Sequence, residues 1–243
     1  MRDDGQLVLG GDEAHVWTAR IEYPLPPRQV ARWLPLLSGD ETDHLEQLWP
    51  GAMRAEYLVT RVLCRTTLSR YATVAPQAWR FLADRDGRPA IDLPRAYRAL
   101  RFNLSHAGGL VACAVRARGE IGVDVEARGK HIGLAVARRY FSAAEVESLL
   151  EIAPERRREQ ILRLWTLKEA YIKAKGRGLS LPLDSFSIGF APAGITLAAD
   201  DDASGNRWQL SLHDHEDSHV LALCVLRRQA GAEIDVRFFP AWN

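Results

Sequence analysis

The stretch Ile121–Glu126, with the sequence IGVDVE, places two acids inside an otherwise apolar strand. Because side chains alternate faces along a strand, Asp124 and Glu126 share one side, while Val123 and Val125 point to the other side and into a core. Carboxylates at that spacing repel each other and raise each other's pKa unless a cation lies between them. The pattern is typical either of a divalent-metal site with oxygen ligands or of the solvated outer face of a half-exposed sheet.

The composition is that of an ordinary globular protein: 243 residues, of which 47% are apolar and 26% charged. The formal net charge of +1 gives no general electrostatic attraction for nucleic acid, so we expect no nucleic-acid partner. The chain starts with the polar MRDDGQ and has no apolar run that could span a bilayer; we expect no membrane partner and a cytoplasmic location. Three cysteines without metal-ligand spacing, Cys64, Cys113 and Cys224, are typical of buried thiols in a reducing compartment.

In the first half of the chain, a strand precedes several helices. Alternating residues predict a strand over His15–Ile21, followed by the stiff connection PLPPRQ. Apolar residues at helical spacing predict helices over Trp33–Leu37, Asp43–Trp49 and Met53–Tyr71. A DRDGRP turn follows, and then the strands RFNLSH and LVACAVRA, joined at Ala107–Gly109.

The second half combines a long helix with further strands. Ser142 and Glu145 predict a capping box, and the helix Arg156–Lys175 ends at a Gly176 cap. The segments SFSIGF, WQLSLH and HVLALCVL alternate like strands, and the last two predict a hairpin around Asp214–Asp217. With a join near Arg118–Glu120, this order predicts an α+β chain with two similar lobes, residues 1–118 and 119–243.

The segment WTLKEAYIKAKGRG, which starts at Trp165, is the second informative one. On a helix, Glu169 and Lys173 are four residues apart and share one face, while Leu164 and Leu167 can face the core. Taken alone, such a pair is a common feature of helix surfaces.

Together, GVDVE and the later W-T-x-K-E-A-x-x-K with Gly-x-Gly-Leu resemble the signature of the 4′-phosphopantetheinyl transferases, in the surfactin-type branch with two fused lobes. DGRP, FNLSH, RYFS and LSLPLDSF stand in the family's order, so the resemblance covers most of the chain. It implies a pseudo-dimer of two α+β lobes with the active site in the cleft between them. It also implies transfer of the phosphopantetheine arm from coenzyme A to a serine of an apo acyl or peptidyl carrier protein, with release of adenosine 3′,5′-bisphosphate. We expect Mg²⁺ or Mn²⁺ as cofactor and a monomeric enzyme.

By this resemblance, Asp124, Glu126 and Glu169 match the acidic triad that holds the metal against the coenzyme's pyrophosphate. Glu169 is also the candidate base that deprotonates the carrier serine, directly or through water. Lys168 and Lys173 match the family's lysines, with Lys173 neutralising the pyrophosphate and assisting the leaving group. Catalytic, metal-holding and carrier-docking residues are therefore expected in the second lobe.

The first lobe is expected to supply contacts to the nucleotide. Ser105 and His106 match a pair that contacts coenzyme A phosphates; as neighbours in a strand they point to opposite faces and cannot form a nucleophile–base pair. Arg88 matches a basic position that reads the 3′-phosphate, although by itself it is an ordinary turn residue. Arg61 resembles a basic helix position near the nucleotide, and Arg54 is a weaker match.

The chain departs from the family pattern at one helix and has two further clusters of polar or aromatic residues. Where the family often carries basic residues after LS in the first helix, this chain has Glu41, His44 and Glu46, so nucleotide contacts there are absent or replaced. The HDHEDSH cluster reads as a polar hairpin tip rather than a metal site. Exposed arginines and aromatic residues make good interface anchors, which predicts that the carrier docks along Arg138, Arg139, Tyr140 and Phe141.

Two alternative functions fit parts of the same pattern. An acid pair with a later Glu and Lys also suits a Mg²⁺-dependent nuclease or phosphodiesterase. A non-catalytic coenzyme A-binding module is the other, although binding alone does not require a candidate base beside the metal.

Overall fold

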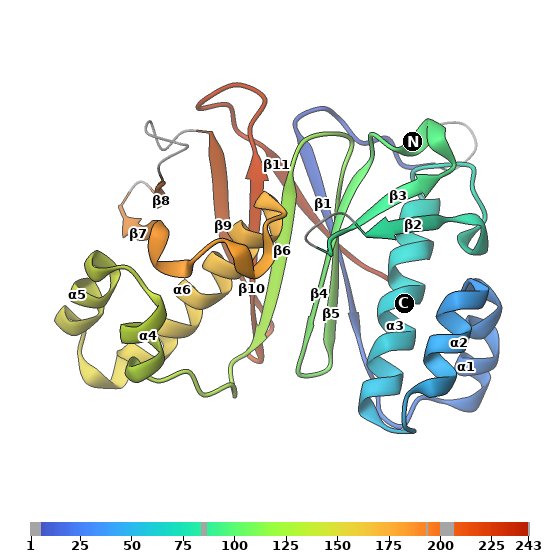
Figure 1. The fold of residues 1–243 in the computed structure, drawn as a ribbon, viewed down its shortest axis with the longest axis horizontal. Coiled ribbons are helices and arrows are strands. Elements are labelled where there is room, and N and C mark those ends of the chain that lie inside the picture. Colours follow the sequence, from blue (N-terminus) through green and yellow to red (C-terminus); the bar gives the residue numbers. More distant parts are fainter. Residues whose placement is uncertain (1–5, 84–86, 193, 200–206, 243) are drawn as a thin grey trace. The chain divides into compact units, whose positions relative to one another are not determined.

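The computed structural model describes residues 6–83, 87–192, 194–199 and 207–242. It divides into two compact units (Figure 1). The first unit has two segments, one that ends at Arg118 and one that begins at Asp235. The second unit is the single segment Gly119–Ile234. The second unit therefore ends before residue 243, where the sequence analysis placed the end of the second lobe. The physical reason is that the C-terminal segment pairs with a strand of the first unit.

A four-stranded sheet forms the centre of the first unit, with strand order β11-β1-β5-β4. β1 (Glu13–Arg20) pairs antiparallel with β5 (Leu110–Arg116), which pairs antiparallel with β4 (Arg101–Ala107). β11 (Asp235–Pro240) lies parallel to β1. This pairing gives hydrogen-bond partners to backbone groups of β1 that an edge strand would leave open.

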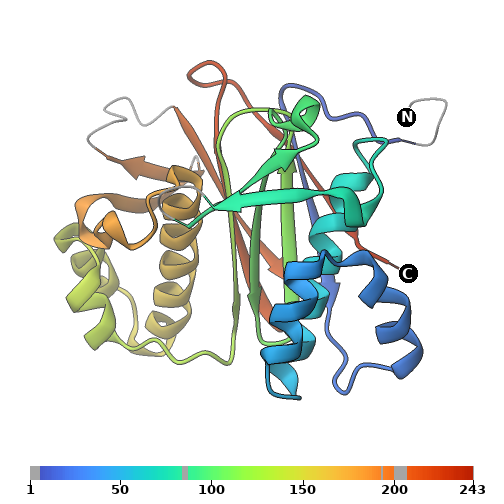
Figure 2. The same cartoon turned by 45° about the vertical axis from the view of Figure 1, so that its right-hand side comes forward.

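Helix α3 (Ala52–Ser69) packs on this sheet and supplies much of the core of the first unit (Figure 2). Its Leu58 and Val62 are buried in one cluster with Val111 and Val115 of β5. The described part of the unit also contains the helices α1 (Pro27–Trp33) and α2 (Gly39–Gln47) and a small antiparallel hairpin of β2 (Arg80–Ala83) and β3 (Pro89–Leu93).

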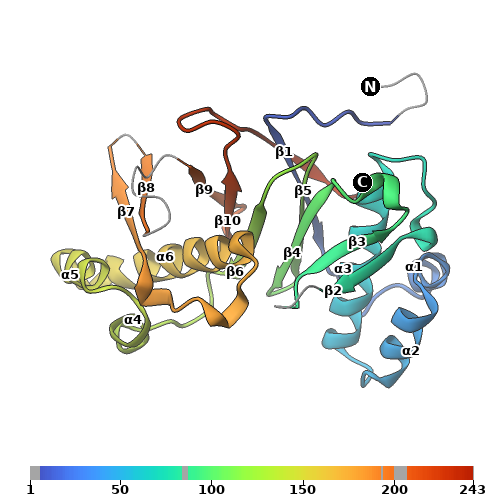
Figure 3. The same ribbon diagram turned by 45° about the horizontal axis from the view of Figure 1, so that its top comes forward.

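The second unit has a three-stranded antiparallel sheet in the order β6-β10-β9, with α6 along it (Figure 3). The strands are β6 (Ile121–Ala127), β9 (Trp208–His215) and β10 (His219–Leu226), and α6 is the 22-residue helix Pro154–Lys175. The described part of this unit also contains α4 (Leu134–Tyr140), α5 (Ala143–Glu151) and the antiparallel pair of β7 (Ser187–Ala191) and β8 (Gly194–Ala198).

Most predicted elements are present. The mixed α+β class is confirmed, the hairpin of β9 and β10 turns where it was expected, and α6 ends at Gly176. Gly176 has φ 64°, a left-handed conformation that glycine adopts without steric cost. The capping box is also confirmed, since the Glu145 carboxylate accepts from the Ser142 amide and the Ser142 hydroxyl accepts from the Glu145 amide. Residues 84–86 of the expected DRDGRP turn lie outside the described residues.

Two helices, α1 and α2, begin four or more residues before the predicted start. α1 begins at Pro27 inside the connection PLPPRQ, because proline suits the first helical position, where no amide hydrogen bond is needed. α2 begins at Gly39 instead of Asp43, because Ser38 and Glu41 form a capping box. Within the described residues, none of the helices is both long and apolar enough to cross a membrane.

Candidate active site

Strand β6 presents Asp124 and Glu126 on a buried face. All residues from Ile121 to Glu126 are buried, and only 5% of Asp124 and 7% of Glu126 is exposed. The reading of this acid pair as a solvated outer face is therefore wrong. α6 packs against β6 and covers the face that carries Asp124 and Glu126.

Gly122 allows the helix to come this close to the strand. It lies two residues before Asp124 and hence on the same face of β6. A Cβ atom there would lie 2.1 Å from the carbonyl oxygen of Ala170 and 2.3 Å from the backbone nitrogen of Ala174. The backbone of α6 fills the space that any other side chain would need. The glycine of the IGVDVE stretch thus fixes the approach of α6 to the acidic face.

Asp124 is held by a lysine from the last turn of this helix. The Nζ atom of Lys173 donates to Oδ1 of Asp124 at 2.7 Å. The Asp124 side chain is 7% exposed and that of Lys173 is 28% exposed, so the ammonium reaches from the solvent boundary to a buried carboxylate. The pair links α6 to the middle of β6.

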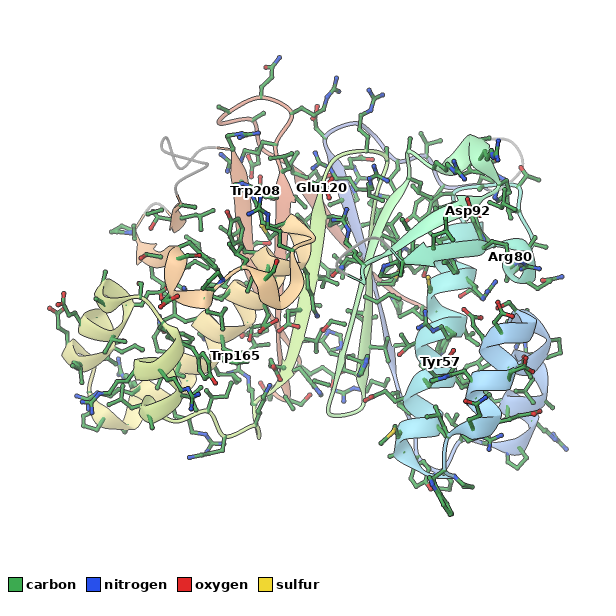
Figure 4. The ribbon with its side chains drawn as sticks, viewed as in Figure 1. Tyr57, Arg80, Asp92, Glu120, Trp165 and Trp208 are labelled. Atoms are coloured by element: carbon green, nitrogen blue, oxygen red, sulfur yellow. The ribbon has the colours of Figure 1, made fainter. Side chains whose placement is uncertain are left out.

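Glu126 has two partners, and both meet the same carboxylate oxygen. Lys130 Nζ and Trp165 Nε1 donate to Oε1, the indole at 3.1 Å. The Lys130 ammonium also lies 5.4 Å from the centroid of the Trp165 ring, within range of a cation–π contact. Trp165, labelled in Figure 4, comes from α6, whereas Lys130 lies just after the end of β6. Burial raises the pKa of Glu126, and the hydrogen bond from Lys130 opposes that rise.

Glu169 completes the acidic group from the half-buried face of α6. Burial raises the pKa of its carboxyl, and the negative charge of Asp124 raises it further, while Lys173 lowers it. Glu126 adds a smaller repulsion. The three carboxylates therefore lie within electrostatic reach of one another, and a cation among them would relieve the repulsion.

The donor chemistry of this group fits a hard divalent cation, because all three side chains offer carboxylate oxygens. No cluster of three or more His, Cys, Asp or Glu side chains is arranged to hold a metal ion in the ranges that the structure describes. Instead, the ammonium groups of Lys130 and Lys173 lie on the two carboxylates of β6. The three acids thus supply suitable ligands for a divalent cation, and in this structure Lys130 and Lys173 are the counter-ions of Glu126 and Asp124.

The structure does not bring Lys168 to this group. Its side chain is fully buried, with Nζ 2.8 Å from Oε1 of Glu145. The same ammonium donates to the carbonyl oxygens of Leu183 at 2.7 Å and Phe186 at 2.8 Å. The prediction that Lys168 binds the coenzyme and takes part in catalysis is not supported by this position. Lys168 follows Thr166 and Leu167 on the core side of α6, whereas Glu169 lies on a half-buried face.

The residues predicted to contact the nucleotide all belong to the first unit. His106 Nδ1 lies 2.7 Å from Oε1 of Glu56 on α3. Ser105 is buried and the His106 side chain is 49% exposed, as expected for neighbours on opposite faces of β4. The guanidinium of Arg61 lies 5.1 Å from the centroid of the Tyr57 ring, and Arg88 is half-buried immediately before β3.

The acidic residue that departs from the family pattern has a structural role. Glu41 Oε2 accepts from Arg65 Nε at 2.6 Å, and both residues are buried. Arg65 also donates to the carbonyl oxygens of Pro76 and Trp79. The pair joins α2 to α3, which explains an acid at this position without reference to a nucleotide.

The histidine cluster lies at the hairpin of β9 and β10. His213 Nε2 bonds to Ser211 at 2.9 Å and His219 Nδ1 bonds to Ser218 at 2.8 Å. Within the described ranges, these histidines form no metal-holding group. The predicted docking segment is only partly exposed: Arg138, Arg139 and Tyr140 are exposed, whereas Phe141 is 4% exposed in the core.

Lys130 and Trp165 are the site residues that the sequence analysis missed. A signal for Trp165 exists, because Trp165, Glu169 and Lys173 stand at four-residue intervals and therefore on one helix face. Lys130 has no such signal, since it follows a strand and reaches Glu126 through a turn in which its amide bonds to the Ala127 carbonyl at 2.9 Å.

Comparison with known proteins shows the family of the chain. Residues 120–224, which include β6 and α6, match the model of the 4′-phosphopantetheinyl transferase superfamily. The chain is 34% identical to the 4′-phosphopantetheinyl transferase Sfp of Bacillus subtilis over 69% of this chain and 73% of Sfp. It is 33% identical to the 4′-phosphopantetheinyl transferase HetI of Nostoc over 76% of this chain and 78% of HetI.

Among solved structures, the holo-[acyl-carrier-protein] synthase of Thermotoga maritima aligns with 45% of this chain and 64% of its own, at 26% identity and a TM-score of 0.38. The likeness to Sfp and HetI extends over more than two thirds of each relative. The chain therefore belongs to the 4′-phosphopantetheinyl transferase superfamily, in the surfactin-type branch of Sfp and HetI.

Proposed function

We propose that this transferase moves the 4′-phosphopantetheine group of coenzyme A onto a serine of an apo acyl or peptidyl carrier protein and releases adenosine 3′,5′-bisphosphate. The observation that carries the proposal is the meeting of β6 and α6 in a chain of this family. There, Asp124 and Glu126 face a helix that supplies Glu169 and Lys173. The family favours this reaction over hydrolysis of nucleic acid and over coenzyme A binding without transfer.

Asp124, Glu126 and Glu169 are the proposed ligands of Mg²⁺ or Mn²⁺. Carboxylate oxygens are the ligands that such hard cations prefer. Burial raises the pKa of Glu169, and the charges of Asp124 and Glu126 raise it further, which supports a cation among the three acids. When bound, the metal offsets negative charge on the phosphoryl oxygens.

Glu169 is the proposed general base. The serine hydroxyl must lose its proton as its oxygen attacks the β-phosphate, and a carboxylate can accept that proton directly or through water. Burial and the charge of Asp124 raise the pKa of Glu169, which makes this carboxylate a stronger base than a solvated one. The half-buried position on α6 leaves part of the side chain open to a substrate.

Lys173 is proposed to neutralise the pyrophosphate and to assist departure of the nucleotide. Its ammonium lies on Asp124 at 2.7 Å and its side chain is 28% exposed, so a phosphate oxygen can share or replace the carboxylate. In the first unit, the proposed coenzyme contacts are Arg61, Arg88, Ser105 and His106. His106 is half exposed on β4, so its ring is open to a phosphate.

The test is incubation with coenzyme A, Mg²⁺ and a panel of apo carriers, followed by the intact mass of each carrier. We expect the mass of one phosphopantetheine group to be added to at least one carrier, and none to be added in EDTA. Modification of no carrier in a broad panel, with coenzyme A still bound, would instead support a binding module. Degradation of DNA or RNA with Mg²⁺ would support a nuclease.

We further propose a cytoplasmic monomer. The described structure holds Cys64, Cys113 and Cys224 as free, buried thiols, which suits a reducing compartment. Light scattering after size exclusion should give one chain per particle, and a larger mass would contradict the monomer.

A further inference from the structure

Each of the two acids of β6 pairs with a lysine, but the two lysines come from different elements. Asp124 takes Lys173 from α6, whereas Glu126 takes Lys130 from the turn after its own strand. The proposed function uses Lys173 at the pyrophosphate and assigns no role to Lys130. The role of Lys130 is open, because its ammonium donates to Oε1 of Glu126, one of the oxygens that would hold the metal.

The Lys130–Glu126 pair is buried at one end only. The Glu126 side chain is 9% exposed, so its carboxylate needs a positive or hydrogen-bonding partner in order to stay ionised. The Lys130 side chain is 42% exposed, so its ammonium can leave the carboxylate and be solvated by water. By contrast, the Lys168 and Glu145 side chains are 0% and 1% exposed, and neither can leave the other without remaining buried and unpaired.

We propose that Lys130 is an exchangeable counter-ion of Glu126: it holds the carboxylate in the metal-free protein and is displaced when the divalent cation binds. The inference rests on the proposed function, because it takes Glu126 as a metal ligand. An ammonium and a divalent cation compete for the same carboxylate, and the cation wins where it gains further oxygen ligands from Asp124 and Glu169. The Trp165 ring, 5.4 Å from Nζ, keeps the ammonium close to the acid until then.

The position of Lys130 implies that its removal increases the affinity of the site for the metal. A lysine that held the metal site together would weaken metal binding when removed. An exchangeable counter-ion competes with the metal, so its removal strengthens metal binding. The gain is the strength of the lost ion pair, which for a pair with one exposed partner corresponds to roughly a 2- to 5-fold lower Kd.

The test measures Mn²⁺ binding without coenzyme A, by the loss of the free-ion electron paramagnetic resonance signal, for the parent, Lys130→Met and Lys130→Arg. Lys130→Met should bind Mn²⁺ about 2- to 5-fold more tightly, and Lys130→Arg should stay near the parent, since arginine can still donate to Glu126. Arg128→Met is the matched control. It removes one positive charge two residues away, from a guanidinium that pairs with Glu159 and Asp214 instead. Its smaller change in Kd measures the long-range effect of charge alone.

A second measurement does not depend on enzymatic activity. In EDTA, Lys130→Met should unfold at a lower temperature than the parent, because a buried carboxylate has lost its partner. Saturating Mn²⁺ should raise the Tm of this variant by more than it raises that of the parent, because ligand binding to the native state is linked to its stability.

The outcomes separate this inference from the function on which it rests. A parent protein that binds Mn²⁺ with a Lys130→Met variant that binds it equally or more weakly would overturn the exchange and leave the metal site intact. Failure of both to bind Mn²⁺ would overturn the metal site itself, and the exchange with it. A change in Lys130→Met no larger than that in Arg128→Met would reduce Lys130 to a distant charge and also overturn the proposal.

Discussion

The ammonium of Lys168 lies 2.8 Å from the carboxylate of Glu145, and the two side chains are 0% and 1% exposed. Glu145 also accepts from the backbone amides of Ser142 and Ile188, and Lys168 donates to two backbone carbonyls near the start of β7. This pair therefore ties α5 and α6 to the chain that enters β7. It supports the helix that presents Glu169, without a contact to the acidic group.

Lys168→Met should lower the free energy of unfolding by about 3–5 kcal/mol, because it leaves the Glu145 carboxylate buried without its counter-charge. Urea denaturation measures the effect. Lys175→Met, on the same helix, is the control and should cost about 1 kcal/mol or less. A Lys168→Met variant with parental stability but without transfer activity would show that Lys168 takes part in catalysis.

Gly122→Ala should destabilise the second unit by about 1–3 kcal/mol or more, because the added methyl meets the backbone of α6. The helix must move away from β6, so transfer activity should fall together with stability. Gly129→Ala is the matched control, since a Cβ there has no heavy atom within 4 Å. Equal stability of the two variants, measured by denaturant midpoints, would mean that α6 does not lie so close to β6.

Acid should weaken the first unit through His15. Burial lowers the pKa of His15, whose Nδ1 bonds to the Tyr71 hydroxyl at 2.8 Å. The unfolded chain then binds more protons than the native state between the lowered pKa and the ordinary value near 6.5, so stability falls as the pH drops through that window.

Replacement by glutamine isolates this effect. The stability difference between the parent and His15→Gln should be larger at pH 7.5 than at pH 5, because only the parent has a histidine to protonate at position 15. Chemical denaturation at the two pH values measures it. A difference that stays constant with pH would show that His15 titrates alike in the folded and unfolded states.

Arg88→Ala should reduce the preference for coenzyme A over dephospho-coenzyme A. A hydrogen bond to a charged group contributes about 1.5–3 kcal/mol, which corresponds to roughly a 10- to 150-fold loss of discrimination. Binding of the two ligands by calorimetry measures the ratio, and Arg95→Ala in the same unit serves as the control. Unchanged discrimination in Arg88→Ala would mean that another residue reads the 3′-phosphate.

Local patterns in the sequence predict the elements well where local physics decides them. The apolar spacing of α3 and α6, the Ser142–Glu145 capping box and the glycine at 176 all act within a few residues of chain, and the structure has each of them. α2 starts four residues before the predicted Asp43, because Ser38 and Glu41 form a capping box there.

Long-range pairing is what the sequence could not supply. β11 is a six-residue strand whose partner, β1, lies more than 200 residues earlier, and no local pattern selects that partner. Lys168 and Glu169 are adjacent in the same motif, yet a turn of about 100° per residue sends them to different surroundings. The sequence shows both charges, but only the fold shows that one of them meets Glu145 in the core.

The last prediction separates metal holding from proton transfer at the acidic group. Asp124→Ala removes one proposed ligand and the partner of Lys173, so it should weaken metal-dependent coenzyme A binding and abolish turnover at ordinary Mg²⁺ concentrations. Glu169→Gln keeps the shape and one ligand oxygen but cannot accept a proton. Coenzyme A should still bind to it, while the chemical step slows by roughly 10²–10⁴, the range for loss of a general base.

Calorimetry of coenzyme A with Mg²⁺ and single-turnover transfer to a carrier measure binding and chemistry separately. Glu159→Gln is the matched control, because Glu159 lies on the same helix and pairs with Arg128 and Arg163 away from the acidic group, so both quantities should stay at parental values. Near-parental single-turnover rates in Glu169→Gln would rule out the general base. Equal losses of binding and rate would make Glu169 chiefly a metal ligand, because a base that acts only in the chemical step leaves the binding of coenzyme A unchanged.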